Sequence, residues 1–87
     1  MKTKILNELQ KRFEFADIYD AVVNGYQCIV YNRVTSSYEN GPDPDYSEQI
    51  TNFLAQYGYN KVGYHTTGCD ERNYENYESY LFSDECF

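Results

Sequence analysis

The chain begins with apolar residues at helical spacing. Residues 2–15 place four of them on one side of a helix, and Thr3 is a candidate N-cap. The positions between them are mostly polar or basic. The pattern predicts a short amphipathic helix with a basic exposed face. The apolar residues of this helix are Ile5, Leu6, Leu9 and Phe13.

After this segment the spacing changes from helical to alternating. Two runs typical of β-strands, residues 17–23 and 26–35, flank Asn24-Gly25. This dipeptide favours a two-residue type I′ turn, because both central residues of that turn need positive φ. The turn then fixes an antiparallel register. The opposing pairs are Val23 with Tyr26, Ala21 with Cys28, and Tyr19 with Val30.

The two faces of this predicted hairpin differ in polarity. The six paired residues form a coherent apolar face, which we expect the first helix to cover. The opposite face is mixed, so either a second helix partly covers it or it is a binding surface. The mixed face carries Ile18, Asp20, Val22, Gln27, Ile29 and Tyr31.

A second helix is predicted after the polar segment 35–45. Asp43-Pro44 should open it, since Asp caps free N–H groups and Pro fits the first helical position. Asp45 and Glu48 complement the dipole of the first turn, and Gly58 is expected to end the helix. The apolar residues at helical spacing are Tyr46, Ile50, Phe53, Leu54 and Tyr57.

The remainder of the chain predicts two more strands. Residues 59–66 show strand character, and residues 79–82 do so again. Between them we favour a loop or a single helical turn at 67–76, although helical spacing also groups residues of the tail. The expected fold is a single acidic α+β domain over residues 1–87, in the order α-β-β-α-β-β. It should have an antiparallel sheet of about four strands with two helices on one face.

The charge of the chain indicates which kinds of partner it can bind. Fourteen acidic residues oppose seven basic ones, giving a formal net charge of −7, and the acids cluster within residues 38–48 and 69–87. Such a field repels phosphate and attracts basic surfaces, so we expect no direct nucleic-acid binding. Eleven tyrosines accompany the acids. Tyrosine combines a large ring with a polar tip and suits binding surfaces.

Compartment and chemistry are constrained mainly by motifs that the sequence lacks. It has no apolar stretch that would span a membrane, no signal-peptide core and no CxxC pair among its three cysteines, so we expect a reducing, cytoplasmic setting. His65 and Cys69, with Asp70 or Cys86, give too few ligands at zinc-site spacing. A Cys–His pair lacks an orienting carboxylate. We therefore expect no enzyme, no cofactor and no metal, with a small enzyme or metal protein centred on His65 and Cys69 as a third interpretation.

The acidic segments are the favoured candidate site. If they converge, their carboxylates form an array spaced like a phosphate backbone, which the Arg and Lys residues of a partner can pair with. A solvated acidic face that only keeps the chain soluble is the competing interpretation. The expected partner-binding residues are Glu39, Asp43, Asp45, Glu48, Asp70, Glu71, Tyr74, Glu75, Tyr77 and Glu78.

A small, acidic, tyrosine-rich chain is similar to phage-encoded inhibitors of host defence, including anti-CRISPR proteins and DNA mimics. The resemblance covers size and charge and aligns no residues. It implies a stoichiometric inhibitor, in the cytoplasm of a bacterial host, that blocks the nucleic-acid site of a basic protein or nucleoprotein complex. The alternative is a self-associating or antitoxin-like interaction module, monomer or dimer, that uses the mixed hairpin face through Ile18, Val22, Ile29 and Tyr31.

Overall fold

The computed structural model describes residues 2–37, 41–67 and 75–85. This part of the chain forms two helices and a four-stranded sheet, which confirms the predicted mixed α+β class. All strand pairs are antiparallel and the strand order is β1-β2-β4-β3. Along the chain the elements are α1 (Lys2–Arg12), β1 (Asp17–Val23), β2 (Tyr26–Ser37), α2 (Ser47–Ala55), β3 (Asn60–Thr67) and β4 (Glu75–Ser83).

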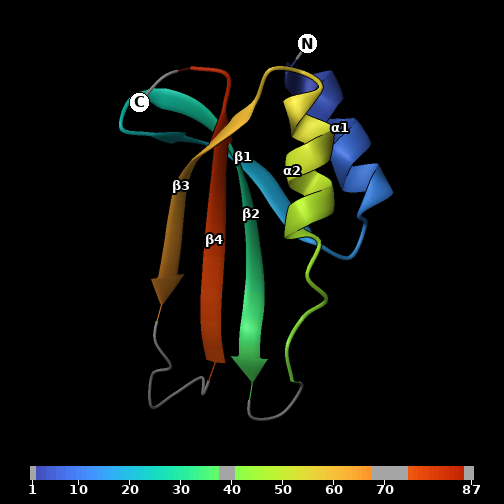
Figure 1. Ribbon diagram of the computed structural model, residues 1–87, viewed down its shortest axis with the longest axis vertical. Coiled ribbons are helices and arrows are strands. Elements are labelled where there is room, and N and C mark those ends of the chain that lie inside the picture. The colour runs from blue at the N-terminus through green and yellow to red at the C-terminus, as the bar shows by residue number, and fades with distance from the viewer. Residues whose placement is uncertain (1, 38–40, 68–74, 86–87) are drawn as a thin grey trace.

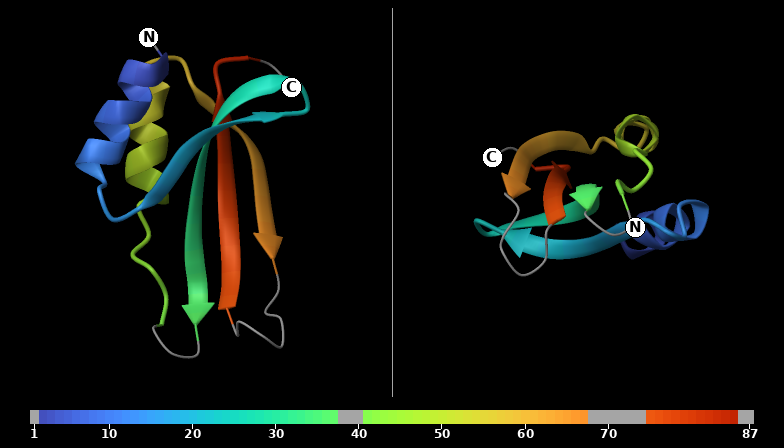
Figure 2. Two further views of the ribbon diagram at one scale, coloured as in Figure 1. Left: turned by 180° about the vertical axis from the view of Figure 1, so that it is seen from behind. Right: turned by 90° about the horizontal axis from the view of Figure 1, so that it is seen from below.

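The helices cover only part of the sheet. Both lie toward one end of the strands, and the C-terminal halves of β2 and β3 extend past them together with the N-terminal half of β4 (Figure 1). Seen along the strands, both helices lie on the same side of the molecule (Figure 2). The far halves of three strands therefore have no helix over them.

Helix α1 is shorter than expected. It ends at Arg12, and turns at Phe13 and Ala16 lead into β1, with backbone hydrogen bonds of 3.0 Å from Phe13 N–H to the Leu9 carbonyl and 2.9 Å from Ala16 N–H to the Phe13 carbonyl. Thr3 lies inside the helix, so the prediction that it caps the N-terminus was wrong. Lys11 and Arg12 in the last turn complement the helix dipole.

The β1–β2 hairpin has the predicted turn and register. Asn24 and Gly25 adopt φ of 53° and 83°, as a type I′ turn requires, and Val23 pairs with Tyr26. The prediction that the first helix covers the face of Tyr19, Cys28 and Val30 was wrong. Ile18, Ile29 and Tyr31 of the opposite face pack into the helix-covered core. On the predicted face Cys28 and Val30 are buried outside that core, and Tyr19 is 40% exposed.

The core joins both helices to three strands. Its members lie at 0–8% exposure, and Phe13, Ala16, Tyr46 and Tyr80 pack around them half-buried. Burial of this apolar surface supplies the main stabilising free energy of the fold. The core residues are Ile5, Leu6, Leu9, Ile18, Ile29, Tyr31, Ile50, Phe53, Leu54, Tyr59 and Phe82.

Helix α2 begins three residues later than predicted and its last residue is Ala55, and Gly58 terminates the following turn as predicted. Asp43 and Pro44 remain outside the helix, and its first residue is Ser47. At the C-terminus Gly58 has φ of 82°, its N–H donates to the Ala55 carbonyl at 3.1 Å, and Tyr59 N–H donates to the Leu54 carbonyl at 3.1 Å. These two bonds form a Schellman motif, whose left-handed position favours glycine.

Strand β4 confirms the predicted fourth strand and begins four residues earlier than expected, at Glu75. Most of the loop or helical turn predicted at 67–76 lies outside the described residues. Strand β4 lies between β2 and β3 and pairs with both, so each of its edges has a hydrogen-bonding partner. Gly63 in β3 faces Leu81, where an added Cβ would lie 3.4 Å from that side chain. An added Cβ would therefore make an ordinary van der Waals contact with the Leu81 side chain.

Candidate partner-binding surface

Three tyrosines form a row across strands β2, β4 and β3. The strand register pairs Tyr31 of β2 with Tyr80 of β4, and Tyr80 with Tyr64 of β3. The ring centroids are 5.9 Å apart between Tyr31 and Tyr80 and 5.0 Å apart between Tyr80 and Tyr64. Tyr31 is buried, but Tyr64 is 55% exposed, so the row leads from the core to the surface.

A buried ion pair lies next to this row. Arg33 and Glu78 pair across β2 and β4, with 2.9 Å between the guanidinium Nη1 and the carboxylate Oε2. The other carboxylate oxygen accepts hydrogen bonds from the hydroxyls of Tyr80 at 2.7 Å and Tyr64 at 3.1 Å. Since a buried carboxylate needs such partners to offset its lost hydration, this network fixes the orientation of both hydroxyls.

The segment before α2 is held against the edge of β2. β1 pairs with β2 only as far as Asn32, so Val34 has an open edge there. Asp43 occupies that edge, because its N–H donates to the Val34 carbonyl at 2.9 Å and its carboxylate accepts from Val34 N–H at 3.0 Å. This role explains why Asp43 does not cap the helix.

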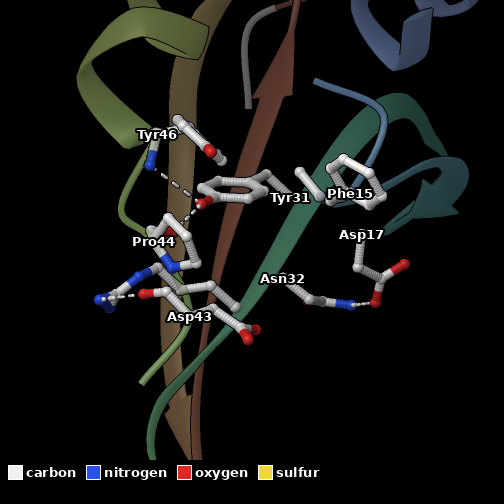
Figure 3. Close-up of a pocket in the computed structure, with 9 residues that line it drawn as sticks. Phe15, Asp17, Tyr31, Asn32, Asp43, Pro44 and Tyr46 are labelled. Atoms are coloured by element: carbon white, nitrogen blue, oxygen red, sulfur yellow. Dashed lines mark hydrogen bonds between the residues drawn. The ribbon is translucent and has the colours of Figure 1, made fainter. Parts of the chain in front are cut away.

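The buried hydroxyl of Tyr31 anchors the same segment. It donates to the Pro44 carbonyl at 3.3 Å and accepts from Tyr46 N–H at 3.1 Å (Figure 3). A cavity of about 30 Å³ lies here between the segment and the start of β1, lined in part by Tyr31, Asn32 and Asp43. Its volume suits about one water molecule. A larger ligand at this place would have to bind on the surface.

Exposed carboxylates lie on the segment before α2 and in its first turn. Asp43, Asp45 and Glu48 are all exposed, and the Asp45 carboxylate accepts from Ser47 N–H at 2.9 Å. Hydrogen bonds from the Ser47 hydroxyl and then from its N–H lower the pKa of Asp45, so it is charged at neutral pH. We call Asp43, Asp45, Glu48, Tyr64 and Tyr80 the acidic tyrosine surface.

The tyrosine hydroxyls of this surface stay protonated. Burial, followed by the hydrogen bond to Glu78, raises the pKa of Tyr80 to about 12. The same two causes in the same order raise the pKa of Tyr64, and the negative charge of Asp45 raises both further. These phenols are therefore hydrogen-bond donors at physiological pH and are poor nucleophiles or bases.

The structure brings together part of the predicted site. Asp45 and Glu78 come from the two predicted acidic segments, and both act on the pKa of Tyr80. Glu78 differs from the expected surface carboxylate, because it is 6% exposed and bound to Arg33. Tyr77 is half-buried and points to the opposite face of the sheet from Glu78, as neighbours on a strand do.

Several predicted residues are not tested. Glu39, Asp70, Glu71 and Tyr74 lie outside the described residues, and Glu75 is described only as the first residue of β4. The mixed hairpin face expected in the alternative hypothesis is not a free surface, because Ile18, Ile29 and Tyr31 belong to the core.

Sequence reasoning did not single out Tyr64, Tyr80 or the supporting Arg33, and it named Tyr31 only for the mixed hairpin face. The sequence did contain a signal for them. On one strand Tyr31 and Arg33 share a face, and on another Glu78 and Tyr80 share a face, so each face carries one ring and one charge, and the two charges are of opposite sign. Their pairing depends on the contact between β2 and β4, which are 45 residues apart at the ion pair.

The alternative metal and cysteine sites gain no support from the described part of the chain. There, no three His, Cys, Asp or Glu side chains gather as metal ligands. His65 is exposed on β3 opposite Ser79, and Cys69 lies outside the described residues. Neither helix of the described chain is long and apolar enough to cross a membrane.

Comparison of the chain with protein-family models, with curated proteins and with solved structures finds no match.

Proposed function

We propose that this protein is a stoichiometric inhibitor that binds a basic nucleic-acid-binding protein through its acidic tyrosine surface and blocks the nucleic-acid site. The observation that carries this proposal is a short segment with three exposed carboxylates, those of Asp43, Asp45 and Glu48, whose Asp45 adds to burial and Glu78 in raising the pKa of the half-exposed Tyr64. Outside α1, the one exposed cation of the described chain is Lys61. The surface thus offers carboxylates and rings to the cations of a partner.

Preorganisation favours this surface as a binding site. Asp43 is held by two hydrogen bonds to Val34, and Asp45 by the start of α2, so little conformational entropy is lost when a partner binds. Surface carboxylates on free side chains would have to be ordered first. The anchored carboxylates can therefore act like the fixed phosphates of a nucleic acid.

The tyrosine rings of this surface can also bind cations through cation–π contacts. The Lys61 ammonium already lies 5.6 Å from the centroid of the Tyr80 ring, a geometry that stabilises a cation on the ring face. The Tyr64 ring beside it has an exposed face of the same kind. An arginine of the partner can stack on Tyr64 while its guanidinium pairs with a nearby carboxylate.

This mode of action belongs to inhibitors of the phage anti-defence type, such as anti-CRISPR proteins, and requires no catalysis, cofactor or metal. Its setting would be the cytoplasm of a bacterial host. A non-mimic interaction module remains the alternative function, and it would bind its partner through apolar contacts that salt does not weaken.

The test is capture of partners from a bacterial lysate on immobilised protein, with elution by added DNA or RNA. We expect a basic nucleic-acid-binding protein that nucleic acid displaces. Glu48→Lys should abolish its capture, whereas Glu8→Lys makes the same charge change on the exposed face of α1 and should leave capture intact. Capture that is equal for both variants and resistant to nucleic acid would contradict the proposal.

A further inference from the structure

A second surface of the molecule combines an exposed aromatic ring with a neighbouring hollow. Phe15, in the turn between α1 and β1, is 92% exposed, the highest value among the exposed large hydrophobic side chains of the described chain. Beside it lies a hollow of about 310 Å³ that Arg12, Phe13, Glu14, Phe15 and Tyr46 line. We call these five residues the Phe15 patch.

The hollow is large enough for a phenyl ring and has aromatic walls. An apolar cavity of about 150 Å³ accommodates benzene in another protein, so the volume here suffices. Phe13 and Tyr46 contact each other with ring centroids 5.3 Å apart, inclined at 46°. A ring that enters the hollow would meet them at the tilted angles that aromatic side chains favour.

The charges of this patch are balanced, unlike those of the acidic tyrosine surface. Arg12 and Glu14 are both exposed in the patch, and Lys11 and Asp17 flank it with one charge of each sign. A chain of net charge −7 repels its own copies over most of its surface. Within the Phe15 patch this repulsion is reduced, because Arg12 offsets Glu14, and Asp43 adds one further anion at the border of the patch.

These features fit a contact between two identical surfaces. A two-fold axis brings the same patch of each copy together, so the patch must be complementary to itself. The Phe15 patch carries both a protruding ring and a hollow for a ring, and both a cation and an anion. We infer that the occupant of the hollow is Phe15 of a second copy of this chain, in a symmetric dimer in which Arg12 of each copy pairs with Glu14 of the other.

The Phe15 patch borders the surface proposed to bind the basic partner. Phe15 and Asp43 line the same small cavity, whereas Tyr64 lies on β3, at the opposite edge of the sheet. The dimer would therefore leave the Tyr64 end of each acidic tyrosine surface exposed. The two proposals are tested by different measurements, self-association for the dimer and capture of a partner for the inhibitor. A negative result for one therefore does not contradict the other.

Sedimentation equilibrium of the full chain over a concentration series tests the inference. We expect a reversible dimer, and Phe15→Ala should weaken it at least about 100-fold, because a central aromatic side chain is lost twice per dimer. Val22→Ala is the matched control, as Val22 is also apolar and 61% exposed but lies near the hairpin tip, and it should dimerise like the unchanged chain. A chain that stays monomeric at every concentration, or a Phe15→Ala variant that dimerises equally well, would overturn the inference.

Charge exchange checks the proposed pairing independently of Phe15. Arg12→Glu and Glu14→Arg should each weaken the dimer about tenfold or more, since each places like charges opposite one another. The double variant restores opposite charges across the axis and should regain most of the affinity. If the double variant is no better than the single ones, the assigned orientation is wrong. Circular dichroism verifies that each variant is folded.

Discussion

Replacement of Glu78 by Gln probes the buried network on which the acidic tyrosine surface is built. The amide keeps the size of the side chain and an oxygen that accepts from the Tyr64 and Tyr80 hydroxyls. It removes the charge that Arg33 faces at 2.9 Å. The guanidinium is then left in a poorly hydrated place, where its Nη2 still donates to the Asp43 carbonyl at 3.3 Å.

The expected loss follows from breaking one half of a buried pair. Removing one partner of such a pair costs about 3–5 kcal/mol, and we expect the lower end because Glu78→Gln preserves the hydroxyl contacts. For a domain of this size a loss of about 3 kcal/mol lowers the melting temperature by roughly 12–24 °C. Arg33→Met should cost less, about 2 kcal/mol, because the carboxylate that it leaves still accepts from two tyrosine hydroxyls.

Urea unfolding followed by circular dichroism measures these losses, with Glu48→Gln as the control. Glu48 is exposed at the start of α2, so its change should stay within about 0.5 kcal/mol. The double variant Arg33→Met with Glu78→Gln should lose less than the sum of the two single changes, with a coupling of about 1–3 kcal/mol. A loss below about 1 kcal/mol for Glu78→Gln, or additive single effects, would refute the reasoning.

Two further predictions concern pH and the end of α2. Because folding raises the pKa of Tyr80 from 10 to about 12, the unfolded chain loses that proton first, and stability should fall as pH rises from 10 to 12, by up to about 3 kcal/mol. Tyr80→Phe should remove one late-titrating phenol from the ultraviolet absorbance titration, and a titration like that of the unchanged chain would contradict this. Gly58→Ala should lower the free energy of unfolding in urea by about 1 kcal/mol, because Gly58 has a φ of 82° that alanine adopts only with strain. The control is Gln56→Ala, which should be near neutral because Gln56 has a right-handed conformation. Equal effects of the two changes would contradict the role of the Schellman motif.

Local sequence was sufficient where local chemistry decides the structure. Asn24-Gly25 fixed the hairpin turn and its register, since few other residue pairs accept two consecutive positive φ values. Gly58 marked the end of α2 for the same reason. Both features depend on a few neighbouring residues and are readable without knowledge of the rest of the chain.

Long-range contacts decided what the sequence could not predict. Both faces of the hairpin carry apolar residues, and pairing of β2 with β4 placed Ile29 beside Phe82 and buried that face. Similarly, Asp43 looked like a helix cap, but the free edge at Val34 binds it instead. Glu78 looked like a surface charge until Arg33, distant in sequence, was placed beside it.

The central claim is that carboxylates of the acidic tyrosine surface engage the cations of a basic partner. The most direct measurement is the affinity for the captured partner, by isothermal titration calorimetry, at two salt concentrations. We predict that affinity falls about tenfold or more between about 0.05 and 0.2 M salt, and that Glu48→Gln makes this dependence shallower. An affinity that is unchanged by salt, in the unchanged chain and in the variant alike, would contradict the claim.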